Sequence, residues 1–187
     1  QRQRNIFQRR QRRQQIEGLE NHADLFATQP RSRIIIKLGN VYAVNFAKQQ
    51  TIGRTTPDGK SEIFVTLPNN SVGNGIVFDR SGKTMFVADY TGHNVIRIDM
   101  ASRKIDVLAH NDQMNQPNDL AIAADGTIFA SDPAWKNNTG QLWRIDTNGK
   151  TTLLAGNLGT SNGIEVSPAG KTLYVNESVQ RNVWAWT

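Results

Sequence analysis

Residues 118–132 read NDLAIAADGTIFASD, and this stretch decides the fold because its marker positions recur along the chain. The asparagine that opens it and the glycine eight residues later return at intervals of 44, once at 74–82 and again at 162–170. After each glycine comes a run rich in β-branched and aromatic residues that ends in a carboxylate. A repeat of this length is the sequence signature of a repeat architecture, so it governs the assignment of single elements.

One copy of the repeat contains four short β-rich runs, at 76–79, 84–89, 95–99 and 105–109, separated by turn residues. This pattern predicts a four-stranded antiparallel meander. No window keeps a 3.6-residue period, so any helix is expected to be short. Repeats of about 40 to 50 residues with four strands each are typical of β-propeller blades. The sequence therefore predicts an all-β propeller, with blades at about 31–67, 74–109, 118–155 and 162–187.

The first copy of the repeat is weaker than the others, and the last copy is incomplete. Gly39 lies 43 residues before Gly82, but Arg31 stands where the other copies have asparagine, and the last copy stops after its third strand at Thr187. Three blades and part of a fourth do not close a ring, since closed propellers need at least about four. We expect a fragment of a longer protein. The alternative is that two copies associate through their open blade edges to complete one ring.

The basic charge of the chain lies in its first residues. The net charge of +6 comes from six arginines within residues 1–15, and the remaining 16 cations balance the 16 carboxylates that follow. Residues 1–30 are expected to be an Arg/Gln-rich disordered tail, and no aromatic pattern there indicates a nucleic-acid partner. The longest apolar run, 120–124, is far too short to span a membrane. A soluble protein is expected, and the cytoplasm is favoured over other compartments.

The recurring asparagines Asn74, Asn118 and Asn162 are the candidate site residues. The first strand of each propeller blade lines the central channel, so residues just before these strands are expected to converge at its mouth. A structural explanation is that Asn-Gly is a favoured turn dipeptide. A functional explanation is that amide oxygens suit Ca²⁺ or another hard divalent cation, joined by at least one carboxylate. Asp119, beside Asn118, could instead reach a substrate hydroxyl.

Two blocks of sequence carry a family resemblance. Residues 116–122 (QPNDLAI), 125–129 (DGTIF) and 131–133 (SDP) form the first, and 161–164 (SNGI) with 171–175 (KTLYV) form the second. Over residues 39–187 the chain resembles the family of SMP-30 (regucalcin), gluconolactonase and luciferin-regenerating enzyme. The resemblance implies a six-bladed propeller with a central divalent metal, Ca²⁺ or Zn²⁺, and hydrolysis of sugar lactones.

The resemblance also implies a site that this chain carries only in part. Two of the family's metal ligands match Asn118 and Asn162, whereas the family's glutamate falls at Arg31 and its aspartate falls beyond Thr187. That aspartate is also the candidate general base, so no catalytic residue is expected within the chain. Asp119 and Asn74 are the candidate contacts to a small lactone or ester substrate. We therefore expect a lactonase or esterase of which this chain alone is inactive, the alternative being a non-catalytic propeller that binds a ligand or a protein.

Three further features suggest structural or bordering roles. The carboxylates that end the second strands, Asp89, Asp132 and Glu177, are expected to accept N–H bonds from turns. Trp143 and Trp184 occupy equivalent third-strand positions, which predicts packing between blades. Trp135 follows Asp132 and Pro133 in a loop, where it is a candidate to border the substrate cleft.

Overall fold

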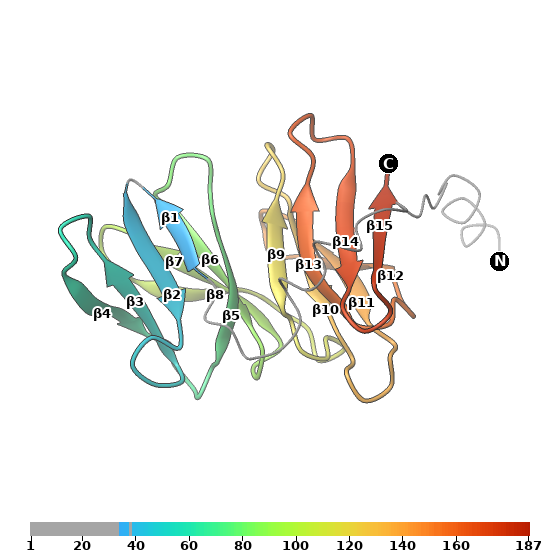
Figure 1. Cartoon of the computed structure of the whole chain (residues 1–187), viewed down its shortest axis with the longest axis horizontal. Coiled ribbons are helices and arrows are strands. Elements are labelled where there is room, and N and C mark those ends of the chain that lie inside the picture. Colours follow the sequence, from blue (N-terminus) through green and yellow to red (C-terminus); the bar gives the residue numbers. More distant parts are fainter. Residues whose placement is uncertain (1–33, 38) are drawn as a thin grey trace.

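A computed structural model of the chain describes residues 34–37 and 39–187 (Figure 1). The described residues form fifteen strands in four antiparallel sheets and no helix. The predicted all-β fold is thus confirmed. The predicted disordered tail at 1–30 and the marker position Arg31 lie outside the described residues.

Each sheet is a meander in which strands adjacent in sequence are also hydrogen-bonded neighbours. The first two sheets comprise β1 (Ile34–Lys37), β2 (Asn40–Val44), β3 (Thr51–Thr55) and β4 (Ser61–Thr66), and then β5 (Gly73–Phe78), β6 (Thr84–Asp89), β7 (Asn94–Asp99) and β8 (Ile105–His110). The third and fourth comprise β9 (Asp119–Ile122), β10 (Ile128–Asp132), β11 (Gln141–Ile145) and β12 (Thr151–Ala155), and then β13 (Ser161–Val166), β14 (Leu173–Glu177) and β15 (Asn182–Trp186). The fourth sheet has three strands among the described residues, one fewer than the others.

The marker glycines close the turn between the first and second strand of their sheets. Gly126 has a φ of +87°, and its backbone N–H donates to the carbonyl of Ala123 at 3.0 Å. Gly82 and Gly170 have φ of +72° and +68° and close equivalent turns. Glycine adopts this left-handed conformation without steric cost, which explains why the repeat keeps it.

Neighbouring sheets pack face to face around three apolar layers. The first layer holds Tyr42 and Phe78, the second holds Phe86 and Trp143, and the third holds Leu142, Val175 and Trp186. Trp184 packs against the third layer, so the predicted packing of Trp143 and Trp184 between sheets is confirmed.

The first strands of the sheets lie side by side along one axis. β5 contacts β9, and β9 contacts β13, as Figure 1 shows for the last pair. We call β1, β5, β9 and β13 the inner strands. Sheets that radiate from adjacent inner strands form part of a β-propeller, which confirms the predicted fold class.

Candidate functional site

The three candidate asparagines lie at the same end of neighbouring inner strands, which we call the site end. Asn118 directly precedes β9, whereas Asn74 and Asn162 are the second residues of β5 and β13. The expectation that each precedes its strand therefore holds for Asn118 alone. Gly73 and Ser161 still pair with the second strands of their sheets, and a shift in register follows before Ile76 and Ile164. Both Asn-Gly pairs thus lie in β-bulges, which redirect side chains.

Ser131 brings the segments of Asn118 and Asn162 together. Its carbonyl accepts a bond from the N–H of Asn118 at 2.8 Å, and its hydroxyl accepts one from the N–H of Asp119 at 3.1 Å. The same hydroxyl donates to the carbonyl of Asn162 on the next inner strand. Ser131 is fully buried, so these bonds are shielded from water. The sequence analysis missed this residue, whose one signal is a hydroxyl at a buried strand position.

The carboxylate of Asp119 crosses from the third sheet to the fourth. Its Oδ2 accepts a hydrogen bond from the backbone N–H of Ile164 at 3.2 Å. On its other side lies Gly75, where an added Cβ would stand 2.7 Å from Asp119 Oδ1 and 2.8 Å from the carbonyl oxygen of Asn118. The position after each marker asparagine is Gly75, Asp119 or Gly163, and the carboxylate of Asp119 occupies space that a side chain at Gly75 would otherwise take.

The amides at the site end are held by the fold. Asn118 is only 5% exposed. The side-chain N–H of Asn162 donates to the hydroxyl of Ser178 at 2.8 Å, which directs its amide oxygen away from Ser178. Asn74 is half-buried, and the neighbouring Gly73 carbonyl accepts a bond from the Asn45 amide at 3.4 Å.

A buried carboxylate near the site end holds the segment of chain that leads to Asn118. Asp132 is fully buried and accepts bonds from the backbone N–H groups of Asn115 and Gln116 and from the indole N–H of Trp143 at 3.0 Å. Burial raises the pKa of Asp132 above its usual value, against the opposing effect of these donors. The predicted structural role of the recurring carboxylates is confirmed for Asp132. It is also confirmed for Asp89, which accepts from the N–H groups of Val72 and Gly92.

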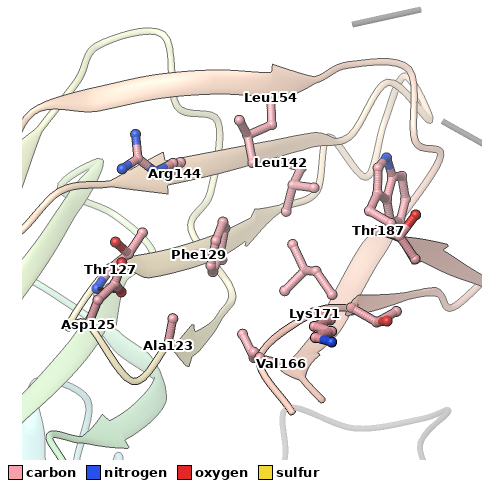
Figure 2. Close-up of a pocket in the computed structure, with 14 residues that line it drawn as sticks. Ala123, Asp125, Thr127, Phe129, Leu142, Arg144, Leu154, Val166, Lys171 and Thr187 are labelled. Atoms are coloured by element: carbon pink, nitrogen blue, oxygen red, sulfur yellow. Dashed lines mark hydrogen bonds between the residues drawn. The ribbon is translucent and has the colours of Figure 1, made fainter. Parts of the chain in front are cut away.

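Two hollows accompany these residues. A shallow one of about 260 Å³ lies at the site end, and its lining includes Asp119, Gly163, Tyr174 and Asn176. A larger one of about 340 Å³ lies between the third and fourth sheets, where Phe129, Leu142 and Lys171 line it (Figure 2). The larger hollow begins at the turn of Ala123 to Thr127, which is the far end of β9 from Asn118. It is therefore separate from the asparagines.

Oxygen atoms of the kind that bind hard cations lie at the site end. Asn118 and Asn162 carry neutral amide oxygens at the same end of the adjacent strands β9 and β13, and the carboxylate of Asp119 lies on β9. Oxygen ligands of this kind suit Ca²⁺, which takes six to eight of them, better than Zn²⁺, which prefers nitrogen and sulfur. Within the described residues no three His, Cys, Asp or Glu side chains gather as metal ligands. The chain thus supplies a partial set of oxygen donors.

Sheets that radiate from adjacent inner strands define this protein as part of a β-propeller. The chain belongs to the SMP-30/Gluconolactonase/LRE-like family, whose pattern matches residues 37–187. The resemblance found in the sequence is thereby confirmed. No helix among the described residues is long and apolar enough to cross a membrane.

Several known proteins are similar to this chain over part of their length. A gluconolactonase of Zymomonas mobilis subsp. mobilis is 24% identical over 179 residues, which cover 81% of this chain and 50% of the relative. A gluconolactonase structure from Xanthomonas campestris matches with a TM-score of 0.64 and 15% identity, covering 81% of this chain and 55% of its own. A chain of a nidogen/laminin complex matches with a TM-score of 0.65 and 20% identity, covering 81% and 59%. This chain therefore spans about half the length of the relatives that it matches.

Proposed function

We propose that this chain is part of a metal-dependent hydrolase of sugar lactones, in which Asn118 and Asn162 provide two ligands to Ca²⁺ or Zn²⁺. The observation that carries the proposal is the meeting of the two asparagine segments at Ser131, which sets both amides at one end of adjacent inner strands. Family membership and the similarity to a gluconolactonase support the substrate class.

The chemistry follows from the donors at the site end. A divalent cation there would polarise the lactone carbonyl and stabilise the negative charge of the tetrahedral intermediate. Asn118 and Asn162 hold that cation, while Asp119 and Asn74 orient the hydroxyl groups of the substrate. The N–H of Ile164 holds one carboxylate oxygen of Asp119 in place. No residue of the chain is assigned as the general base.

Cation binding by the purified chain tests the proposal. We expect calorimetric titration with CaCl₂ or ZnCl₂ to show weak binding, since two of the four implied ligands are at hand. Asn118→Ala and Asn162→Ala should each weaken it at least about tenfold, corresponding to roughly 1.4 kcal/mol. Asn137→Ala, at an exposed loop position, is the matched control and should leave the affinity unchanged. Equal affinities of all four proteins would contradict the assignment of the two ligands.

Lactone hydrolysis provides the second test. Proton release from D-glucono-1,5-lactone, followed in a pH-stat, is expected at the uncatalysed rate with this chain alone. It should rise above that rate in a longer protein that contains residues 1–187 and the aspartate expected beyond Thr187. A longer protein without activity, even with bound cation, would contradict the hydrolase.

A non-catalytic binding propeller is the second candidate. The fold similarity to a chain of the nidogen/laminin complex favours it, because that protein is seen in complex with another protein. Under this alternative, the chain and its longer form bind neither cation and hydrolyse no lactone.

We also propose that the chain associates with a second copy of itself through its open sheet edges. The fourth sheet has three strands among the described residues where the other sheets have four, so a strand from a second copy would complete it beside β15. Light scattering after gel filtration should then give twice the chain mass of 20.9 kDa. A monomer at all concentrations would exclude this association.

A further inference from the structure

Trp135 is an exposed aromatic side chain in a loop at the site end. It is 38% exposed, whereas Trp143 and Trp186 are buried at 2% and 9% exposure. It lies in the loop of residues 133–140, between β10 and β11. An isolated exposed apolar side chain is common on protein surfaces. Trp135 differs from such a side chain in where its loop is anchored.

The loop begins at Asp132, the residue that holds the segment leading to Asn118. Asp132 ends β10 and holds the backbone N–H groups of Asn115 and Gln116, which lie just before Pro117 and Asn118. Three positions after Asp132 comes Trp135. The start of the loop and the first candidate ligand thus share one buried anchor.

The loop ends at the segment that leads to Asn162. The N–H of Gly140 donates to the carbonyl of Gly159 at 2.7 Å, and the N–H of Leu158 donates to the carbonyl of Gly140 at 2.9 Å. A Cβ at Gly140 would stand 2.6 Å from both the Gly159 carbonyl oxygen and Ser161 Oγ, so glycine is required for this close approach. Ser161 directly precedes Asn162.

The turn that carries Trp135 is itself ordered by hydrogen bonds. The N–H groups of Asn137 and Asn138 both donate to the carbonyl of Ala134, at 3.1 and 2.8 Å. Asn138 adopts a φ of +52°, a conformation that asparagine tolerates better than most residues. Trp135 therefore lies in an ordered turn of a loop whose two ends are hydrogen-bonded to the segments that lead to Asn118 and Asn162.

We propose that Trp135 is a stacking platform for the ring of the sugar substrate. An aromatic face gains dispersion and apolar contact from the C–H groups of a pyranose ring, while amides and carboxylates bind its hydroxyl groups. The inference rests on the proposed function and adds a specificity residue to it. Trp135 favours cyclic sugars over open-chain ones, because only a ring offers a flat C–H face.

Fluorine NMR on the chain labelled with 5-fluorotryptophan tests this role. The four tryptophans give four resonances, which single Trp→Phe variants assign. Methyl β-D-glucopyranoside, whose ring is locked, is expected to shift the Trp135 resonance saturably and to leave the buried Trp143 unmoved. D-gluconate, an open chain, should shift neither.

The affinity for the same glucoside, followed by the backbone amide shifts of Asp119 and Asn162, gives a second measurement. Trp135→Ala should raise the dissociation constant about three- to tenfold, and Trp135→Tyr should restore most of the affinity. Leu153→Ala is the matched control, since Leu153 is 46% exposed on the outer strand β12 of the same sheet. It should leave the dissociation constant unchanged.

The results distinguish sugar stacking on Trp135 from the metal-dependent hydrolysis proposed above. A Trp135 resonance that does not move, or an affinity that Trp135→Ala leaves intact, overturns the platform. If calorimetry still shows cation binding that depends on Asn118 and Asn162, the hydrolase proposal survives that result. If Trp135 responds to the glucoside while no cation binds, the platform stands and the hydrolase fails.

Discussion

Asp119 and Ile164 are joined across two sheets by a hydrogen bond of 3.2 Å from the Ile164 N–H to the Asp119 carboxylate. The bond connects adjacent inner strands at the site end, where Asn118 and Asn162 lie. Because it involves a charged acceptor, it is stronger than a neutral hydrogen bond. The geometry of the candidate site and the packing of the third sheet against the fourth therefore depend on the same carboxylate.

Asp119→Ala is expected to lower the free energy of unfolding by about 1.5 to 3 kcal/mol, because the bond to Ile164 is lost. Urea denaturation followed by tryptophan fluorescence measures this. Asp119→Asn keeps an acceptor oxygen and should cost less. Asp112→Ala, at a side chain that is 94% exposed, is the control. A loss no larger than that control would show that the inter-sheet bond contributes little.

Gly75→Ala is expected to destabilise the chain by about 1 to 3 kcal/mol, as overpacked substitutions do. The new Cβ would meet the backbone of Asn118 and Asp119 below 3.0 Å, and the backbone cannot move aside without shifting β9. Gly156→Ala is the matched substitution, since nothing lies within 4 Å of its added Cβ. Equal unfolding midpoints for the two variants would refute the close approach.

Ser131→Ala should weaken both the fold and cation binding. It removes the hydroxyl that links the Asp119 N–H to the Asn162 carbonyl, two half-buried groups whose lost hydrogen bonds then cost about 1 to 3 kcal/mol. Unfolding in urea measures the first effect, and calorimetric titration with CaCl₂ measures the second. Unchanged cation affinity in a destabilised variant would mean that Ser131 supports the fold alone.

Asp132 and Asp99 should give opposite pH dependences. Burial raises the pKa of Asp132 above 3.8, so the native state binds more protons there than the unfolded state, and its contribution to stability falls as the pH rises through that raised pKa. The Ser102 N–H and hydroxyl lower the pKa of Asp99 below 3.8, so its contribution is present above that value and is lost as the pH falls.

Urea unfolding between pH 3 and pH 6 tests both signs against variants that do not titrate. As the pH is lowered, the free energy of unfolding of the unsubstituted chain should rise relative to that of Asp132→Asn. Relative to Asp99→Asn, it should fall. Parallel curves for a variant and the native chain would remove the assignment for that residue.

The fold could be predicted because its signals are local. Gly126 marks a turn that needs a positive φ, and Trp143 marks a strand that faces the next sheet. Both follow from short-range conformational preference and burial, which recur with the repeat. The spacing of 44 residues then fixed the order of the sheets.

The site could be predicted only in part, because its decisive contacts join distant residues. The sequence indicated a common position for Asn118 and Asn162, but their meeting at Ser131 depends on how two sheets pack. Asn-Gly was interpreted as a turn dipeptide or a ligand. The structure gives a third reason for the glycine at position 75. The carboxylate of a residue from another sheet occupies the space that a side chain there would need.

The stacking of sheets in sequence order has a mechanical consequence. The second and third sheets are each covered on both faces, whereas the first and fourth each have one covered face among the described residues. A linear array held by nearest-neighbour interfaces frays from its ends. Amide exchange should therefore be slowest at the middle, in β6 and β10, so that the half of the candidate site around Asn118 outlasts the half around Asn162 when the array begins to open.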